Sequence, residues 1–307
     1  MKIATSTGDF ARFLVSDEDR LRALHKAGFR YVDLELYNMD RMTTIYAEGN
    51  WQKEVEKLKK LKDELCLTFV QSHAPSGNGT DPIIINEKHE EFFEATVRSI
   101  KISAALGIKN VAFHGGMKRD IGKAEWFEQN KVFIDRLIPI LEEYDVNLLV
   151  ENTTKKNLWG IYYPCSGQEI LEFINYVNHK NVLACWDTGH ANCEGSQYDD
   201  IVTLGDKLKA IHYNDNHGNL DEHVIPYLGT LNHDEVINAL IDIGYSGYFT
   251  LESGNSLVRK KGWPHSRREF EKDDRLATPP LFLQEGLESL MYQTAKYMLE
   301  KYGIFEE

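Results

Sequence analysis

The chain has 307 residues, of which 42% are hydrophobic, and carries a formal net charge of -13. An acidic balance of this kind argues against a nucleic-acid partner, because neutralising phosphates needs clustered Lys and Arg. The four cysteines lack CxxC spacing and no apolar run is long enough to span a membrane, so we expect a reduced, cytoplasmic protein without membrane association.

One pattern recurs along the chain: helical periodicity, a glycine, a short gap, and a dense apolar run that stops at a polar residue. Gly28, Gly107 and Gly244 stand at such junctions. Glycine suits the left-handed position after a helix, and dense apolar runs are typical of buried parallel strands. The expected strands, in chain order, are Lys2–Ser6, Tyr31–Leu36, Thr68–Ser72, Asn110–His114, Asn147–Glu151, Val182–Trp186, Ala210–Tyr213 and Gly247–Glu252.

Apolar residues at helical spacing lie between these strands, for example Trp51 to Leu65, Phe93 to Ala104, Ile134 to Leu141 and Leu283 to Thr294. Eight strands alternating with helices predict an α/β fold, a (β/α)8 barrel, as a single domain over residues 1–307. The alternative is an open, doubly wound sheet. The count of eight and the lack of a GxGxxG motif after the first strand favour the barrel.

Ionisable side chains stand at or just after seven of the eight expected strand ends. They are Glu35, His73, His114, Glu151, Asp187, His212 and Glu252. The carboxyl ends of the strands form the active-site face of such a barrel. Burying carboxylates and imidazoles is costly unless each is paired or binds a cation. The pattern therefore indicates a metal or catalytic site at this face.

The best set of metal ligands comes from the last four strands: Glu151, Asp187, His212 and Glu252. Consecutive strands should bring these side chains to one side of the barrel mouth. Three oxygen ligands and one nitrogen ligand suit Mn²⁺, Mg²⁺, Co²⁺ or Zn²⁺ better than a thiolate-preferring metal.

Two further groups have more than one interpretation. His190, Asp221 and His223 could bind an additional Zn²⁺, contact the substrate, or be ordinary polar loop residues. His73 and His114 could be metal ligands or hydrogen-bond donors to the substrate.

The motifs SHAP, FHGG, VENT, WDTGH, HYNDNHGNLDEHVIPYLGT and LESG, in this order, resemble the xylose-isomerase-like TIM barrels. That superfamily holds sugar and sugar-phosphate isomerases and epimerases, inositol-pathway isomerases, and the zinc enzyme endonuclease IV. The resemblance implies one divalent ion held by Glu151, Asp187, His212 and Glu252. It also implies that Glu151 and Glu252 act as acid and base and that His190 contacts the sugar.

The endonuclease branch is a rival, because it implies three zinc ions on nine ligands, and residues of all nine types are present. They are His73, His114, Glu151, Asp187, His190, His212, Asp221, His223 and Glu252. The acidic charge and the lack of a basic early loop with wedge residues favour the sugar branch. The basic tract Arg259–Arg268 is either a solvated insertion or an anion clamp, and it is also the feature that best supports the endonuclease.

We therefore predict a metal-dependent isomerase or epimerase of a sugar or sugar phosphate, acting through an enediolate with Glu151 and Glu252 as acid and base. A barrel that only binds sugar is the non-enzyme alternative. The segment Trp263 to Phe270 could serve a homo-oligomer interface. The expected substrate contacts are His190, His73, His114, Glu35, Asp221 and His223, with Trp159, Tyr162 and Trp186 as walls.

Overall fold

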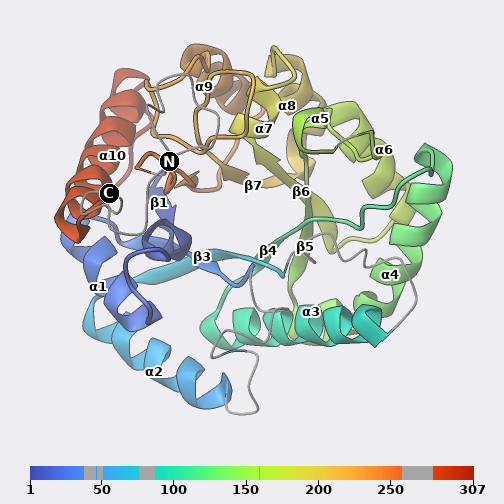
Figure 1. The fold of residues 1–307 in the computed structure, drawn as a ribbon, viewed down its shortest axis with the longest axis horizontal. Coiled ribbons are helices and arrows are strands. Elements are labelled where there is room, and N and C mark those ends of the chain that lie inside the picture. The colour runs from blue at the N-terminus through green and yellow to red at the C-terminus, as the bar shows by residue number, and fades with distance from the viewer. Residues whose placement is uncertain (38–45, 47–50, 76–86, 159, 258–278) are drawn as a thin grey trace, which may run out of the picture.

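The computed structural model describes residues 1–37, 46, 51–75, 87–158, 160–257 and 279–307. The predictions for Trp159, for the basic tract 259–268 and for the interface segment 263–270 lie outside these residues. The described residues form the predicted (β/α)8 barrel, with a ring of strands surrounded by helices (Figure 1).

All eight predicted strands are present, and each strand begins and ends within two residues of its predicted position. They are β1 (Ile3–Ser6), β2 (Tyr31–Glu35), β3 (Thr68–His73), β4 (Asn110–Phe113), β5 (Asn147–Glu151), β6 (Val182–Asp187), β7 (Leu208–His212) and β8 (Phe249–Leu251).

The strands pair in parallel in the order β7-β6-β5-β4-β3-β2-β1-β8. A parallel bridge between Tyr213 and Leu251 joins the two ends of this order. Tyr213 N–H donates to Thr250 O at 2.7 Å and Glu252 N–H donates to Tyr213 O at 3.1 Å. These bonds bring β7 beside β8, so the carboxyl ends of all eight strands meet around one mouth.

The longer described helices follow the strands around the ring, and short helices occupy several of the loops. They are α1 (Asp17–Ala27), α2 (Trp51–Glu64), α3 (Glu87–Leu106), α4 (Lys123–Tyr144), α5 (Lys155–Leu158), α6 (Gly167–Val177), α7 (Thr188–Asn192), α8 (Tyr198–Leu204), α9 (His233–Asp242) and α10 (Leu281–Lys301), with 3-10 turns η1 (Thr7–Phe10) and η3 (Gly205–Lys207).

The glycine junctions fold as the sequence predicts. Gly28, Gly107 and Gly244 have φ angles of 117°, 82° and 63°, which residues with a Cβ adopt only with strain. Gly28 N–H donates to the carbonyl of His25 and ends α1. Each glycine thus stops a helix and turns the chain toward the next strand.

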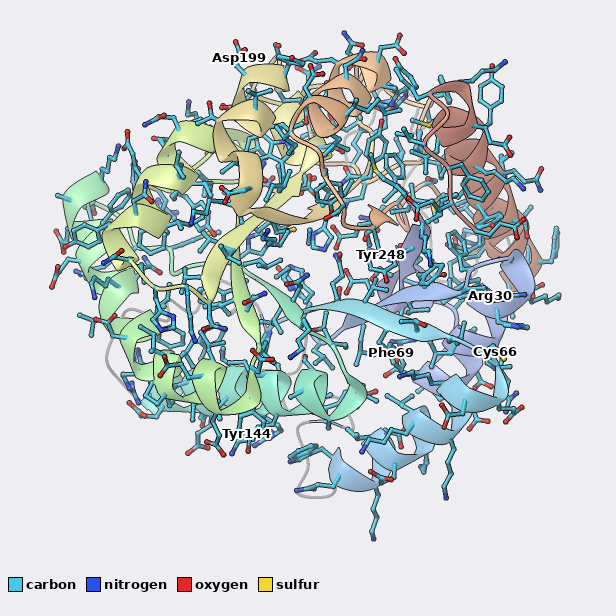
Figure 2. The ribbon with its side chains drawn as sticks, turned by 180° about the vertical axis from the view of Figure 1, so that it is seen from behind. Arg30, Cys66, Phe69, Tyr144, Asp199 and Tyr248 are labelled. Atoms are coloured by element: carbon cyan, nitrogen blue, oxygen red, sulfur yellow. The ribbon has the colours of Figure 1, made fainter. Side chains whose placement is uncertain are left out.

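Two sets of buried side chains fill the barrel. The larger core lies between the strands and the helices and includes Phe29, Trp126 and Trp186, all 0% exposed. A separate small cluster, inside the ring, consists of Ala112, Leu149, Leu183, Cys185 and Ala210. Seen from the opposite side, the interior of the ring is filled by side chains (Figure 2).

The inward faces of β2, β3 and β8 carry polar residues where β4 to β7 carry apolar ones. Side chains two residues apart on a strand share a face. Asp33, Gln71 and Thr250 therefore face inward two residues before Glu35, His73 and Glu252, and all three are buried. A register irregularity between Val32 and Asp33 places Asp33 opposite Gln71 instead of Val70.

Helix α10 forms at its predicted place, but a different face of it packs on the barrel. Leu283 and Leu290 are 43% and 51% exposed, whereas Gln284 and Glu288 are 0% exposed. Burial raises the pKa of Glu288 well above its ordinary value, and Gln284 donates to Glu288 Oε1 at 2.8 Å. The leucine spacing thus predicts the helix correctly without identifying the face that meets the core.

Among the helices that the structure describes, none combines the length and the apolar character that crossing a bilayer requires.

Candidate active site

A cavity of about 430 Å³ opens at the carboxyl ends of the strands. Five of the seven side chains that the sequence places at strand ends line this cavity, and the other two, Asp187 and His212, are buried close to Glu151 and Glu252. Its lining includes Glu35, His73, His114, Glu151, His190, Asp221, His223 and Glu252, with Asp9, Arg12, Tyr37, Met117 and Asn157.

The four predicted metal ligands come together. Glu151, Asp187, His212 and Glu252 each offer a ligand atom, and these atoms all lie within 4.8 Å of one another. Glu151, Asp187 and His212 are almost fully buried, and the Glu252 side chain is 21% exposed. A single cation could therefore contact all four side chains, of which Glu151 and Glu252 line the pocket.

His212 lies between carboxylates. Its Nδ1 is 2.9 Å from Glu151 Oε1 and 3.5 Å from Glu252 Oε2, and its Nε2 is 3.1 Å from Asp33 Oδ2. Burial opposes the charged imidazolium, but Cys185 and these carboxylates together outweigh burial and raise the pKa of His212 well above its ordinary value. The surroundings of His212 therefore favour a positive charge at this point of the site.

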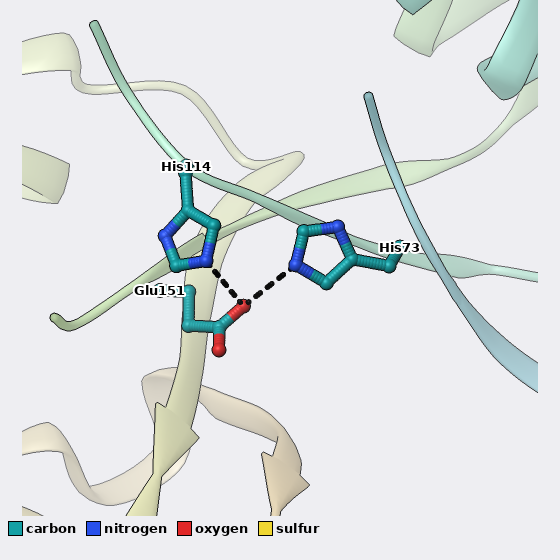
Figure 3. A group of neighbouring side chains, drawn as sticks. All are labelled: His73, His114 and Glu151. Carbon is teal, nitrogen blue, oxygen red and sulfur yellow. Dashed lines mark ion pairs between the residues drawn. The ribbon is translucent and has the colours of Figure 1, made fainter. Parts of the chain in front are cut away.

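Glu151 meets two further imidazoles. His73 Nε2 lies 3.3 Å and His114 Nε2 lies 3.7 Å from the same oxygen, Glu151 Oε2 (Figure 3). Burial lowers the pKa of His114 to about 3, whereas Glu151 raises the pKa of His73 to about 9 against the effect of burial. His114 is thus neutral and able to bind a metal, while His73 balances the charge of Glu151.

Tyr163 holds the ends of two of these strands together. Its hydroxyl donates to Glu151 O at 3.1 Å and accepts a bond from Gly115 N–H at 2.8 Å. Trp126 closes the same corner, because its indole N–H donates to Gly116 O at 2.7 Å. These bonds fix His114 and Glu151 side by side.

Asp187 ends β6 and begins α7. Its Oδ1 accepts the N–H of His190 at 2.6 Å as the helix cap, and its Oδ2 accepts Asn214 Nδ2 at 2.8 Å. Asn152 accepts Asp187 N–H at 2.7 Å, and its carbonyl lies 3.0 Å from His190 Nδ1. The turn therefore aims both Asp187 and His190 at the pocket.

The predicted second group also assembles. Asp221 lies between His190 Nε2, at 3.2 Å from Oδ2, and His223 Nε2, at 2.9 Å from Oδ1. Burial opposes charge on both histidines, but Asp187 and Asp221 raise the pKa of His190 to about 10, and Asp221 raises that of His223. Asp187, His190 and His223 form one candidate metal group, and His73, His114 and Glu151 form another.

Two of the predicted sugar walls are wrong. Trp186 is 0% exposed and packs outward, with its indole N–H donating to Gln197 Oε1 at 2.9 Å, since it alternates with the inward Cys185 and Asp187. Tyr162 packs against Trp126 with ring centroids 6.0 Å apart, and neither residue lines the pocket. Tyr37 and Met117 line it instead.

Four residues that position the site were not predicted: Asp33, Asn152, Tyr163 and Asn214. Asn152 and Asn214 follow ligands within the motifs VENT and HYND, so proximity in sequence could have indicated them. Asp33 stands two residues before Glu35 on the same inward face, which strand periodicity could have indicated. Tyr163 follows the short helix α5 and carries no local signal.

Comparison with known proteins agrees with this architecture. The family model described as xylose isomerase-like TIM barrel matches residues 21–272. The chain belongs to this family, as the order of its motifs predicts. A sequence relative named L-ribulose 3-epimerase, from Methylomonas sp. (strain DH-1), is 26% identical over 247 residues, which cover 76% of this chain and 77% of the relative.

Solved structures share the fold. A D-psicose 3-epimerase in the presence of D-fructose superposes with a TM-score of 0.73 at 15% identity, covering 97% of this chain and 99% of that one. The IOLI protein with a bound zinc atom gives 0.74 at 18% identity, covering 99% and 100%. An AP endonuclease of family 2 from Brucella melitensis gives 0.66 at 18%, covering 82% and 93%. At these identities the likeness establishes the fold alone.

Proposed function

We propose that this protein is a divalent-metal-dependent isomerase or epimerase that acts on a ketose, an aldose or one of their phosphates. The observation that carries the proposal is the convergence of ligand atoms of Glu151, Asp187, His212 and Glu252 within 4.8 Å of one another, beside a pocket of about 430 Å³ that Glu151 and Glu252 line. A pocket of that volume accommodates a small molecule. The relative named L-ribulose 3-epimerase supports the same class of reaction.

The residues fit a divalent ion. Three carboxylates and one imidazole form the donor set that Mn²⁺, Mg²⁺, Co²⁺ and Zn²⁺ accept. Glu151 Oε2 is buried and accepts no well-aligned hydrogen bond from the described residues. Buried carboxylates this close together are costly without a cation. A bound ion would supply Lewis-acid stabilisation of the negative charge that develops on two neighbouring substrate oxygens.

Glu151 and Glu252 are the proposed proton carriers. Burial opposes ionisation of Glu151, but His212 holds its pKa well below the ordinary value. Burial raises the pKa of Glu252, and His212 and His223 only partly offset this. When the surroundings of two carboxyl groups separate their pKa values, the group with the lower pKa stays ionised and the group with the higher pKa can hold a proton. One can then accept a proton while the other donates one.

Two reactions are open to these glutamates in this proposal. One glutamate removes the proton from the carbon beside the carbonyl, which leaves an enediolate. If the other glutamate returns a proton to the opposite face, the product is an epimer. If one glutamate carries the proton to the neighbouring carbon, the product is the aldose or ketose isomer. His190, His73, His114, Glu35, Asp221 and His223 would orient the hydroxyls from the pocket wall.

The direct test is a screen of ketoses, aldoses and their phosphates with the protein loaded with Mn²⁺, Mg²⁺ or Co²⁺, with products resolved by NMR. We expect one substrate to be converted to its epimer or isomer and the chelated protein to be inactive. Conversion that persists after chelation would contradict the metal dependence, and no conversion of any substrate would favour a barrel that only binds sugar.

A second candidate function is that of a zinc AP endonuclease similar to endonuclease IV. The two extra ligand groups support it, since they share Glu151 and Asp187 with the main site and would hold two more ions. The net charge of -13 opposes it. Zinc analysis separates the two: three ions per chain together with cleavage of duplex DNA at an abasic site would replace the sugar proposal.

A further inference from the structure

A chain of buried hydrogen bonds runs across the inside of the barrel to His212. Thr250 Oγ1 donates to Gln71 Oε1 at 3.0 Å, and Gln71 Nε2 donates to Asp33 Oδ2 at 2.9 Å. The same oxygen, Asp33 Oδ2, lies 3.1 Å from His212 Nε2. Thr250, Gln71, Asp33 and His212 are each 2% exposed or less.

This series of hydrogen bonds determines which nitrogen of His212 faces the ligand cluster. A neutral imidazole has one N–H and one lone pair, and the partner of the N–H decides which is which. Asp33 can only accept at Nε2, so the hydrogen stays on Nε2. When an ion displaces the proton from Nδ1, the lone pair of this nitrogen is free to bind the ion beside Glu151 Oε1 and Glu252 Oε2, which lie 2.9 and 3.5 Å from Nδ1.

Gln71 in turn holds Asp33. Because Thr250 donates to the amide oxygen of Gln71, the NH₂ group is directed to Asp33. The irregular register at Val32 and Asp33 is what puts Asp33 and Gln71 next to each other on the inward face. Three strands, β2, β3 and β8, thus cooperate to orient a side chain on β7.

Packing alone gives no reason for a carboxylate at this position. Asp33 Oδ1 is buried and has no hydrogen-bond partner among the described residues. The matching inward positions on β4 to β7 are filled by Ala112, Leu149, Cys185 and Ala210, which avoid that desolvation cost. The free-energy cost of burying the Asp33 carboxylate must therefore be offset by its interaction with His212.

We propose that Asp33 is a positioning residue that orients His212 as a ligand for the divalent ion, with Gln71 and Thr250 holding Asp33 in place. The inference rests on the metal site of the proposed function. Partners of this kind for a ligating histidine contribute about 10–100-fold to metal affinity.

The test compares Mn²⁺ binding by calorimetry in the wild type, Asp33→Asn, Gln71→Met and Asp17→Asn. We expect Asp33→Asn to weaken binding about 10–100-fold and Gln71→Met to weaken it less, because Asp33 is then only less well held. Asp17 is the matched control. It is a buried aspartate at the start of α1 that accepts hydrogen bonds from Arg20 and Tyr46, so its replacement should lower thermal stability and leave Mn²⁺ affinity unchanged.

The visible absorption of the Co²⁺ form adds a readout that a merely structural role would not move. We expect the Co²⁺ bands to change in Asp33→Asn and to stay as in the wild type in Asp17→Asn. Unchanged Mn²⁺ affinity and Co²⁺ bands in Asp33→Asn would overturn the inference while leaving the metal site intact. If Asp33→Asn does not fold, Gln71→Met decides by the same criteria. A wild type that binds neither metal overturns both the site and the inference.

Discussion

His212 Nδ1 lies 2.9 Å from Glu151 Oε1, with both side chains almost fully buried at the ends of β7 and β5, which flank β6. Burial opposes charge on both groups, but their pairing raises the pKa of His212 and lowers that of Glu151, so the pair favours a shared proton. A divalent ion would take the place of the proton, since both groups bind metals in their deprotonated forms.

Replacing Glu151 by Gln should therefore abolish tight metal binding. The change keeps the size of the side chain but removes the charge that the other ligands share. We expect Mn²⁺ affinity, measured by calorimetry, to fall more than in Asp33→Asn, because Glu151 is a ligand and Asp33 acts through one. Equal affinity in Glu151→Gln and the wild type would remove Glu151 from the proposed ligand set.

His190→Gln distinguishes a sugar contact from a ligand of an additional ion. If His190 orients the sugar, KM rises while the protein still holds one ion per chain. We expect this result, because Asp221 already pairs with His190 at 3.2 Å and with His223 at 2.9 Å. A loss of bound zinc from the variant, measured by elemental analysis, would instead assign His190 to a second metal site.

Glu35 should make the metal-free protein less stable as the pH rises. Burial raises its pKa to about 7, so the folded chain holds a proton that the unfolded chain has released above pH 4.5. This contribution is complete below the unfolded pKa and is lost as the pH rises through about 7. The measurement is the free energy of unfolding in urea at several pH values between 5 and 8, whose slope against pH gives the number of protons taken up on folding. In Glu35→Gln this number should be lower than in the wild type by about one. If the unfolding free energies of the wild type and Glu35→Gln depend on pH in the same way, the pKa of Glu35 is not raised.

Two glycines test the packing that supports the site. A Cβ on Gly189 would lie 1.8 Å from Asn214 Oδ1, the side chain that bonds Asp187, whereas a Cβ on Gly286 in α10 meets nothing within 4 Å. We expect Gly189→Ala to destabilise the fold by more than about 2 kcal/mol and to weaken metal binding. Gly286→Ala should stabilise it by about 0.5–1 kcal/mol through helix propensity. If Gly189→Ala and Gly286→Ala unfold at similar temperatures, the predicted difference in their stability is wrong.

Much of this architecture follows from local sequence patterns. Apolar runs identify the eight strands, and the residue that ends each run identifies the pocket, because parallel strands bring their carboxyl ends together. The patterns predict that Glu151, Asp187, His212 and Glu252 lie together, and the structure brings their ligand atoms within 4.8 Å of one another. His190, Asp221 and His223, which the sequence groups, are also neighbours. Family resemblance adds the expectation of metal-dependent sugar chemistry.

The rest depends on side-chain direction, which composition does not specify. The position of Trp186 beside Asp187 predicts a pocket wall. The side chain faces the helices instead, because successive side chains on a strand point to opposite faces. The spacing of Leu283 and Leu290 predicts that they face the core. In the structure, α10 instead buries Gln284 and Glu288. Asp33 acts through a hydrogen-bond chain across three strands, and such a chain appears only once the register is known.

The central claim is proton transfer by Glu252 at a metal-bound pocket, and solvent-proton exchange tests it most directly. The Mn²⁺-loaded wild type and Glu252→Gln would be incubated in D₂O with the sugar that the screen identifies, and deuterium beside the carbonyl would be followed by NMR. We expect the wild type to incorporate deuterium and the variant to lose at least about 100-fold in exchange rate, the usual contribution of a positioned acid or base. Exchange in Glu252→Gln as fast as in the wild type would contradict the mechanism.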